Sequence, residues 1–381
     1  MRLLMFLLAG MCAALCAYVA VGYPLLVSLL ARRRGALEPE PTSSAGCTVL
    51  LVVRNEERRI ARRLRNLQRQ KPAGCIRQIV VVDDRSTDST MQILLRFQQR
   101  DTRICVLSGT GSGKAAGINT GMAACKTDIA VLADARQVFE QHAVSRLMAR
   151  LVDSRVGLVA GELRYTAEKR SEVPATAGLT YWRIERKLRG AEGALGFLPC
   201  VSGAIYAVRT ECMPSMPENV ILDDIYAPLL VARAGWRVVY APDAVAWDIE
   251  VAPGHEFRRR VRTLAGNFQL IRLLPWSLCF WRSGSRWAFV SHKALRLILP
   301  VIGLSGVLAL LTAVSGNAVI TLLATSTVAA LGLLLNRLRI RGPIGTLAAT
   351  ISGVLIFVLA TAMAAWSVMR RQEGMLWRGR N

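Results

Sequence analysis

The stretch IVVVDDRSTD, residues 79–88, joins four apolar, branched residues to three acids, two hydroxyls and an arginine. Four branched residues in succession predict a strand that is buried on both faces, as in a parallel sheet. The polar residues then form the turn at the carboxyl end of this strand, which is the end where open α/β sheets bind ligands. Taken alone, the stretch also fits an ordinary loop in which Asp and Ser cap the next helix.

The composition indicates a protein that is partly embedded in a membrane. Its 381 residues are 52% hydrophobic and have a mean hydropathy of +0.34, which is too apolar for an ordinary soluble enzyme. The formal net charge of +23 leaves three classes of partner open: nucleic acid, an anionic membrane surface and an anionic substrate. No nucleic-acid-binding motif accompanies the arginines, so we expect contact with membrane lipids and none with nucleic acid. The nine cysteines show no paired metal-binding spacing and predict reduced thiols.

Apolar segments lie near both ends of the chain. Residues 3–30 carry no charge and are followed by arginines at positions 32–34, which predicts a membrane-spanning helix whose carboxyl end faces the cytoplasm. A cleaved signal peptide is excluded, because its charges precede a shorter apolar region. Three further segments, at residues 294–314, 318–335 and 344–368, are long enough to span a bilayer.

The sequence leaves the number of C-terminal spans open. Four spans in total would leave the tail from Arg370 outside, whereas its arginines favour the cytoplasmic side. The alternative is that one apolar segment is re-entrant or lies along the membrane interface. We therefore divide the chain into a transmembrane helix with a basic stop (1–34), a linker (35–45), a cytoplasmic domain (46–254), an interfacial amphipathic segment (255–287), two to three transmembrane helices (288–369) and a basic tail (370–381).

The domain between the membrane segments alternates strands and helices. Residues 48–53, 79–82 and 104–107 predict buried strands that are separated by helices. This rhythm predicts an α/β fold with a doubly wound nucleotide-binding half.

Acids directly follow two predicted strands. Asp83 and Asp84 follow residues 79–82, and Asp134 follows a further strand at residues 129–132. We expect these two strands to be adjacent, so that their carboxylates meet at one edge of the sheet. Short carboxylates at such an edge can accept hydrogen bonds from a base or ribose, or share a metal ion.

Three later segments add polar or glycine positions. The segment GTGSGK, residues 109–114, is similar to a phosphate-binding loop, but Ala115 stands where that loop needs a hydroxyl. This departure argues against a P-loop, and Lys114 remains a candidate phosphate contact. Gly203 follows a serine and allows close approach to the backbone. Two acids at positions 223–224 begin a predicted helix, where acids are also common helix caps.

The motifs of the domain occur in a definite order. They are Val53-Arg54-Asn55-Glu56, Val82-Asp83-Asp84 with Ser86 and Asp88, Gly113-Lys114 with Asn119 and Gly121, Asp134-Ala135-Arg136, Ser202-Gly203 with Arg209, and Asp223-Asp224 before Gly235 and Pro242. As an ordered set they resemble the family 2 glycosyltransferases of GT-A fold, over residues 46–270. Within that family they look most like membrane-integrated bacterial poly-N-acetylglucosamine, hyaluronan and chitin-type synthases and lipid glycosyltransferases. The resemblance implies a Rossmann-like GT-A nucleotide-sugar domain inserted between transmembrane helices.

The resemblance also implies roles for single residues. Asp224 matches the catalytic base, which takes the proton of the acceptor hydroxyl as that hydroxyl attacks opposite the leaving diphosphate. Asp134 matches the first acid of the family's DxD motif, beside the ribose and a divalent metal, so Mg²⁺ or Mn²⁺ is the implied cofactor. The residues implied in nucleotide-sugar binding are Asn55, Glu56, Asp84, Lys114, Asp134 and Arg262, and those implied in acceptor binding are Ser202, Gly203 and Asp223.

Two positions depart from the family pattern. Arg136 replaces the second acid of DxD, so either Asp134, the diphosphate and water hold the metal, or Arg136 supplies part of its charge. The Q-x-x-R-W motif of processive members is reduced to Arg262, which can still clamp a diphosphate. The missing tryptophan argues against a processive polymerase. Residues 258–262 also fit a basic patch on the membrane surface.

The resemblance leads to a membrane-embedded inverting glycosyltransferase, either a hexosyl- or an N-acetylhexosaminyltransferase. It would move a sugar from a UDP-sugar to a growing polysaccharide or a membrane lipid. We expect a multi-pass protein of the bacterial inner membrane with a cytoplasmic catalytic domain, working with other subunits of an export complex. The alternative is a degenerate transferase-like domain that serves as a nucleotide-sensing or scaffold subunit of a polysaccharide export complex.

Overall fold

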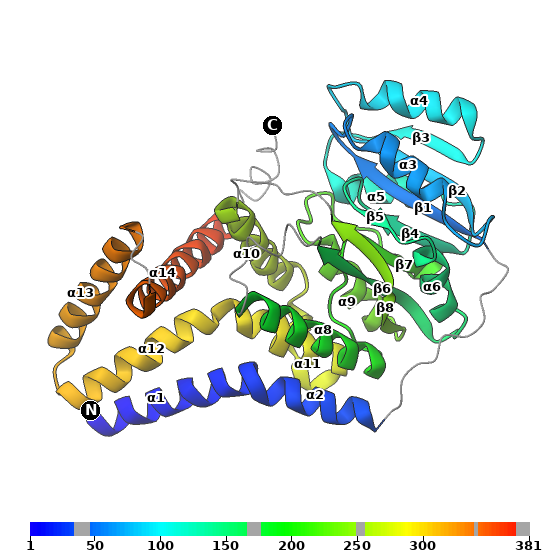
Figure 1. The fold of residues 1–381 in the computed structure, drawn as a ribbon. Helices are drawn as coiled ribbons and strands as arrows, with labels where there is room; N and C mark the ends of the chain where they lie inside the picture. Colours follow the sequence, from blue (N-terminus) through cyan, green and yellow to red (C-terminus); the bar gives the residue numbers. More distant parts are fainter. Residues whose placement is uncertain (34–45, 166–176, 249–255, 339–341, 371–381) are drawn as a thin grey trace. The chain divides into compact units, whose positions relative to one another are not determined.

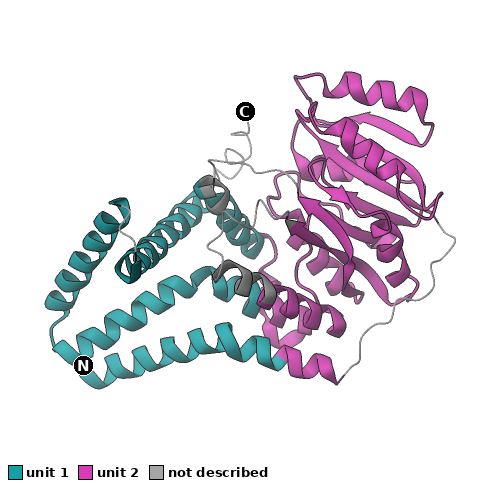
Figure 2. Cartoon of the chain, viewed as in Figure 1, with its two compact units in different colours: residues 1–26, 255–272, 290–376 teal, residues 27–254, 273–289, 377–381 magenta. Residues whose placement is uncertain are grey.

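The protein is described by a computed structural model, whose helices and strands are shown in Figure 1. The described residues are 1–33, 46–165, 177–248, 256–338 and 342–370. The chain divides into two compact units, which we call the sheet unit and the helical unit (Figure 2). The sheet unit comprises residues 27–254, 273–289 and 377–381, and the helical unit comprises residues 1–26, 255–272 and 290–376.

Among the described residues, the sheet unit is built on one eight-stranded sheet with the order β3-β2-β1-β4-β7-β6-β8-β5. Its strands are β1 (Cys47–Val53), β2 (Ile76–Asp83), β3 (Ile104–Ser108), β4 (Ile129–Ala133), β5 (Val138–Phe139), β6 (Val156–Tyr165), β7 (Ile205–Arg209) and β8 (Arg237–Asp248). The first four strands run parallel, whereas β7 runs antiparallel to both β4 and β6. The unit is therefore mixed α/β, with a parallel half that matches the predicted doubly wound segment.

The expectation that the two acid-bearing strands are adjacent is wrong, because β1 lies between β2 and β4. The chain moves outward from β1 to β2 and β3 and then crosses back to pair β4 with the other side of β1. Such a reversal of strand order is the point where open α/β sheets bind their ligands, beyond the carboxyl ends of the strands. The two acidic turns therefore flank the reversal point.

Helices cover both faces of the parallel half (Figure 1). The helices of the sheet unit are α3 (Ile60–Gln68), α4 (Thr90–Arg100), α5 (Lys114–Ala123), α6 (Ala143–Arg150), α8 (Ala177–Leu195), α9 (Asp223–Arg233) and α11 (Gly284–Ala288), with short 3-10 turns at Thr210–Cys212, Pro275–Leu278 and Phe280–Arg282. One face of β1 places Val49 and Leu51 in the main hydrophobic core with α3 and α6. On the other face, α5 approaches so closely that a Cβ on Gly121 would lie 2.1 Å from Cδ1 of Leu50. This packing places the first residue of α5, Lys114, at the edge where the acidic turns lie.

The predicted strands at residues 48–53, 79–82, 104–107 and 129–132 correspond to β1, β2, β3 and β4. The sequence did not indicate β5 or α6. β5 has only two residues, which is too short for an alternating pattern to be recognised.

The helical unit contains the long apolar helices. Its elements are α1 (Arg2–Ala17), a π-helical segment (Tyr18–Gly22) that leads into α2 (Tyr23–Arg32), α10 (Glu256–Leu273), a second π-helical segment (Phe289–Ala294), α12 (Leu295–Ser315), α13 (Ala318–Arg337) and α14 (Gly342–Met369), of which α2, α10 and the second π-helical segment cross the unit boundaries. In the described part of the chain, four helical stretches are long and apolar enough to cross a membrane: Arg2–Arg32, Gly284–Ser315, Ala318–Arg337 and Gly342–Met369.

Small residues allow these helices to pack closely. A Cβ on Gly306 of α12 would lie 2.7 Å from the Cβ of Cys12 in α1, and the Tyr18 hydroxyl lies 2.8 Å from Oγ of Ser291. In the absence of a hydrophobic driving force between helices in lipid, such close contacts and hydrogen bonds hold spans together.

Candidate functional site

Asp84 organises the glycine-rich loop at the carboxyl edge of the sheet. Its Oδ1 accepts a hydrogen bond from the backbone N–H of Gly111 at 2.8 Å, and its Oδ2 accepts one from Gly113 at 3.1 Å. Asp84 is 2% exposed, and a Cβ on Gly109 would lie 3.0 Å from its Oδ1. The loop therefore needs glycine to fold over Asp84, and a contact between Asp84 and a nucleotide stays a prediction.

Asn55 and Glu56 connect the turn after β1 to the turn after β2. The Asn55 backbone N–H donates to Oγ of Ser86 at 3.0 Å, and its side-chain oxygen accepts from the Thr87 N–H at 2.8 Å. The Glu56 N–H donates to Oγ1 of Thr90 at 2.8 Å. Asn55 has a φ of 55°, a left-handed conformation that asparagine tolerates better than most residues. These contacts brace the loops beside Asp84, and the predicted nucleotide contacts of both residues remain to be tested.

Lys114 joins two acids that lie far apart in the sequence. Its Nζ is 3.1 Å from Oδ1 of Asp134 and 3.3 Å from Oδ2 of Asp223. The side chains of Lys114 and Asp134 are partly exposed, whereas that of Asp223 is only 10% exposed. Lys114 thus provides a positive charge between the carboxyl end of β4 and the first turn of α9.

The charge of Lys114 is stable in this environment. Burial alone would lower the pKa of its ammonium group, but the carboxylates of Asp134, Asp223 and Asp224 more than offset that effect and raise the pKa above its usual value. Lys114 is therefore positively charged over the physiological pH range.

The turn before β7 lies against the same group of side chains. A Cβ on Gly203 would lie 3.2 Å from Nζ of Lys114 and 3.7 Å from the Cβ of Asp224. The backbone N–H of Val201 donates to the carbonyl oxygen of Asp224 at 2.9 Å, and the Ile205 N–H donates to the Ser202 carbonyl at 3.0 Å. Five predicted positions therefore lie in one place: Lys114, Asp134, Gly203, Asp223 and Asp224. We call them the acid–lysine cluster.

Arg136, which replaces an acid of the family motif, has an acidic partner of its own. Its Nη2 lies 2.6 Å from Oδ2 of Asp248, a residue at the end of β8 that is completely buried. Removing Arg136 would take this ion pair away from the buried carboxylate of Asp248. The positive charge of Arg136 is thus largely neutralised by Asp248.

Tyr206 belongs to this site although the sequence did not single it out. It is the second residue of β7 and is fully buried. Burial, followed by the charges of Asp223, Asp224 and Asp134, holds the pKa of its phenol well above the usual range. An aromatic residue within an apolar strand is normally a core residue, so the sequence contained no signal for it.

Arg262 is the one predicted site residue outside the sheet unit. It lies in α10, within the helical unit, and is partly exposed. Its predicted contact with the diphosphate stays a prediction.

A metal ion would have few protein ligands here. Among the described residues, no three His, Cys, Asp or Glu side chains gather in a way that could hold one. Asp134 is the acid that fits, since Mg²⁺ often takes only one or two carboxylates together with substrate phosphates and water.

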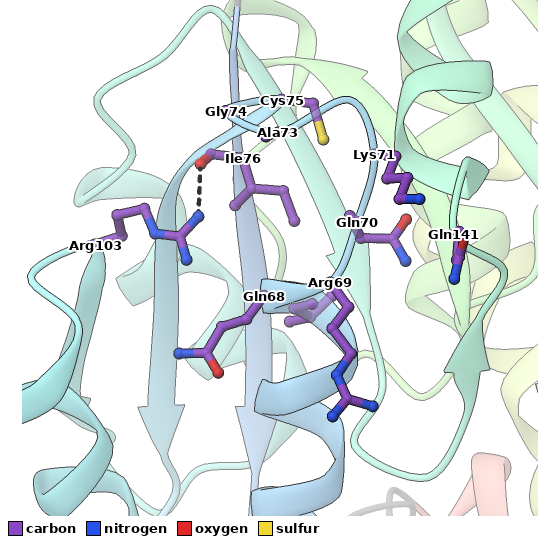
Figure 3. A pocket seen from close by; sticks show the side chains of 11 residues that line it. Gln68, Arg69, Gln70, Lys71, Ala73, Gly74, Cys75, Ile76, Arg103 and Gln141 are labelled. Carbon is purple, nitrogen blue, oxygen red and sulfur yellow. Dashed lines mark hydrogen bonds between the residues drawn. The ribbon is translucent and has the colours of Figure 1, made fainter.

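A cavity of about 360 Å³, shown in Figure 3, lies at the opposite end of the strands from the acid–lysine cluster, where β2 begins. Its lining includes Arg69, Lys71 and Arg103, with Ile76 at the amino end of β2. Arg103 donates from Nη1 to the Ile76 carbonyl at 3.5 Å. None of the predicted site residues lines this cavity, so we place the candidate site at the acid–lysine cluster, where the charged groups converge.

Comparisons with known proteins agree with this fold. Residues 48–206 match the family model described as "Glycosyl transferase family 2". The poly-beta-1,6-N-acetyl-D-glucosamine synthase of Staphylococcus aureus (strain COL) is 22% identical over 231 residues, which are 59% of this chain and 55% of that protein. The probable glycosyltransferase YdaM of Bacillus subtilis is 23% identical over 229 residues, which are 58% of this chain and 54% of that protein. The chain thus spans about half the length of these relatives.

A solved structure shares the fold over most of the chain. The mannosyltransferase PcManGT from Pyrobaculum calidifontis, in complex with GDP-Man and Mn²⁺, aligns with a TM-score of 0.65 at 22% sequence identity. The alignment covers 93% of this chain and 99% of PcManGT. The sheet unit is therefore a GT-A-like domain.

Proposed function

Since residues 48–206 belong to glycosyl transferase family 2, we propose that the protein is an inverting transferase. Its donor is a nucleotide diphosphate sugar, and we propose a UDP-sugar. The acceptor is a growing polysaccharide or a membrane lipid at the cytoplasmic face. The observation that carries this proposal is the acid–lysine cluster at the reversal point of the sheet, where Lys114 Nζ lies within 3.3 Å of both Asp134 and Asp223.

The proposed reaction needs a base and a positive charge. Asp224 takes the proton of the acceptor hydroxyl while the new bond forms at the anomeric carbon and the bond to the diphosphate breaks on the opposite face. Lys114 is positively charged at physiological pH and meets the negative charge that develops on the departing diphosphate. Gly203 leaves room beside both groups, since a side chain there would meet them.

A divalent cation would have one protein carboxylate as a ligand at this site, that of Asp134. Asp134 would hold Mg²⁺ or Mn²⁺ with the diphosphate and water, whereas Arg136 is committed to Asp248. When bound, the cation would supply further neutralisation of the leaving diphosphate. The relative PcManGT was solved with Mn²⁺ and GDP-Man, so both cations and a GDP-sugar belong in the test.

The acceptor is proposed to be membrane-associated. Four helical stretches in the described residues can cross a membrane, and one of the relatives named above is a polysaccharide synthase. A polymer or lipid acceptor held at the membrane agrees with both observations.

The test is a transfer assay with the full-length protein in detergent or lipid nanodiscs. The donors are UDP-N-acetylglucosamine, UDP-glucose and GDP-mannose, each with Mg²⁺ or Mn²⁺, and the products are sized. We expect nucleoside diphosphate release with at least one donor. A ladder of products indicates polymer synthesis, and a single glycolipid indicates transfer to lipid.

Asp224→Asn tests the base. Because a general base accelerates such steps by roughly 10²–10⁴-fold, kcat should fall by that factor while donor binding is retained. Asp128→Asn, at an exposed acid of the sheet unit, is the matched control and should leave kcat unchanged. Full turnover by Asp224→Asn would refute the base assignment. Nucleotide binding by wild type without turnover of any donor would favour the scaffold alternative.

A further inference from the structure

The hydroxyl of Tyr206 is buried without a hydrogen-bond partner among the described residues. Buried polar groups are nearly always paired, because an unpaired one costs stability. Phenylalanine would fill the same space in β7 without that cost, so the hydroxyl needs an explanation.

The position of Tyr206 brings it beneath the acid–lysine cluster. It pairs with Leu132 across the antiparallel β7–β4 ladder, and directly paired residues of two strands lie on the same face of the sheet. Leu132 lines a small cavity together with Lys114 and Gly203. Tyr206 therefore lies on the face that α5 covers, next to the floor of the site.

Asp223 has an unsatisfied atom in the same region. Its Oδ2 makes a charge contact with Lys114 at 3.3 Å but accepts no hydrogen bond in the described residues. The charges that act on the Tyr206 phenol come first from Asp223 and then from Asp224 and Asp134. A protonated phenol, which can donate, thus lies near a carboxylate whose Oδ2 has only the charge contact with Lys114.

We propose that Tyr206 is a positioning residue, whose hydroxyl donates a hydrogen bond to Asp223 when the donor diphosphate draws Lys114 away. This hydrogen bond would hold the first turn of α9, and with it Asp224, in place during proton transfer. The inference rests on the proposed function. No proton leaves Tyr206: the acceptor proton passes to Asp224, and the electron pair of the broken anomeric bond leaves with the diphosphate.

Tyr206→Phe in the full-length protein tests this role. A hydrogen bond to a charged group corresponds to roughly 10- to 100-fold in rate, so kcat should fall by about that factor. KM for the donor and the Kd for UDP should rise, by no more than the same factor, because the hydrogen bond forms only when the diphosphate is bound. The melting temperature of the ligand-free protein should stay the same or rise, because no hydrogen bond is lost in that state.

Two further variants separate positioning from simple structural damage. Tyr240→Phe removes a buried hydroxyl that does donate, to Glu162, and should lower the melting temperature. In an Asp223→Ala background, Tyr206→Phe should have no additional effect on kcat, because the acceptor of its hydrogen bond is gone.

Each alternative outcome has a distinct pattern. Wild-type turnover with an unchanged kcat in Tyr206→Phe overturns the role of Tyr206 and leaves the proposed function intact. Parallel losses of kcat, UDP binding and melting temperature indicate structural damage and also overturn it. Absence of wild-type turnover with every donor refutes the proposed function and this inference together.

Discussion

At the scale of single residues, the site depends on Lys114, whose positive charge balances the carboxylates of the acid–lysine cluster. It contacts Asp134 and Asp223, and it is also influenced by Asp224. Without it, the three carboxylates would have less positive charge near them and would repel the proposed diphosphate.

We therefore predict that Lys114→Met reduces kcat by at least ~100-fold, since a single preorganised charge contact in the transition state has about that value. The Kd for UDP should rise as well. Lys126→Met, at an exposed lysine in the loop after α5, is the control and should behave as wild type. Isothermal titration and steady-state kinetics measure both effects. Unaltered UDP binding in Lys114→Met would contradict the role of Lys114 as a diphosphate contact.

We expect the stability of the protein to depend on the protonation of Asp101. It directly follows α4, and its Oδ2 lies 2.7 Å from Nη2 of Arg103 and accepts a hydrogen bond from Gln68 of α3 at 2.8 Å. The hydrogen bond from Arg103 lowers the pKa of Asp101 despite partial burial. A lowered pKa means that the ionised form stabilises the fold at any pH above the unfolded pKa.

Asp101→Asn should therefore destabilise the protein by about 1.5–3 kcal/mol at pH 7, the usual range for hydrogen bonds to charged groups. The wild-type advantage is lost as the pH falls from about 4, where Asp101 titrates in the unfolded chain, through its lower folded pKa. Melting temperatures of both proteins between pH 7 and pH 3 measure this difference. A constant difference across that range would show that Asp101 does not titrate as described.

At the scale of elements, the close packing of α5 on β1 positions the site. Gly117 and Gly121 allow this approach, since a Cβ would lie 2.5 Å from Cγ1 of Val52 and 2.1 Å from Cδ1 of Leu50 respectively. α5 begins with Lys114, so a shift of the helix would move the lysine away from its carboxylates.

Gly121→Ala should destabilise the protein by roughly 1–3 kcal/mol through overpacking and should also lower kcat. Gly190→Ala in α8 is the control, because nothing lies within 4 Å of the added Cβ. It should stabilise the protein by about 0.5–1 kcal/mol, the usual gain from glycine to alanine inside a helix. Thermal unfolding compares the two variants. Equal effects would mean that α5 can move away from β1 without cost.

At the scale of the whole molecule, the chain combines a GT-A-like sheet unit with helices that can span a membrane. The arginines at positions 32–34 favour a cytoplasmic end for the first span. The next span would then end outside, at the turn between α12 and α13.

We predict that a cysteine introduced by Ala318→Cys, at the start of α13, reacts with a membrane-impermeant maleimide on intact cells. A cysteine introduced by Ala123→Cys, at the exposed end of α5, should react only after permeabilisation. Labelling above that of the unsubstituted protein is the measured signal. The reverse pattern would overturn the proposed cytoplasmic location of the sheet unit.

The amino-acid sequence was sufficient to predict a mixed α/β fold and the residues that meet in the acid–lysine cluster. Runs such as residues 79–82 predict buried strands because β-branched residues in succession suit a sheet covered on both faces. The acids after two of these strands predicted a ligand-binding site at the carboxyl ends of the strands, and long charge-free segments predicted helices that are long and apolar enough to span a membrane. Each of these patterns lies within a short segment, so it can be recognised without knowledge of the fold.

The contacts themselves depend on which strands become neighbours, and that is a property of the folded chain. β1 separates β2 from β4, contrary to expectation. Arg136 pairs with Asp248, 112 positions away, and neither residue indicates the other in the sequence. Tyr206 looks like any core aromatic residue until β7 is paired with β4. Local sequence patterns indicate which residues are buried and with what period. Which residues and strands contact one another depends on the packing of segments that are far apart in the sequence.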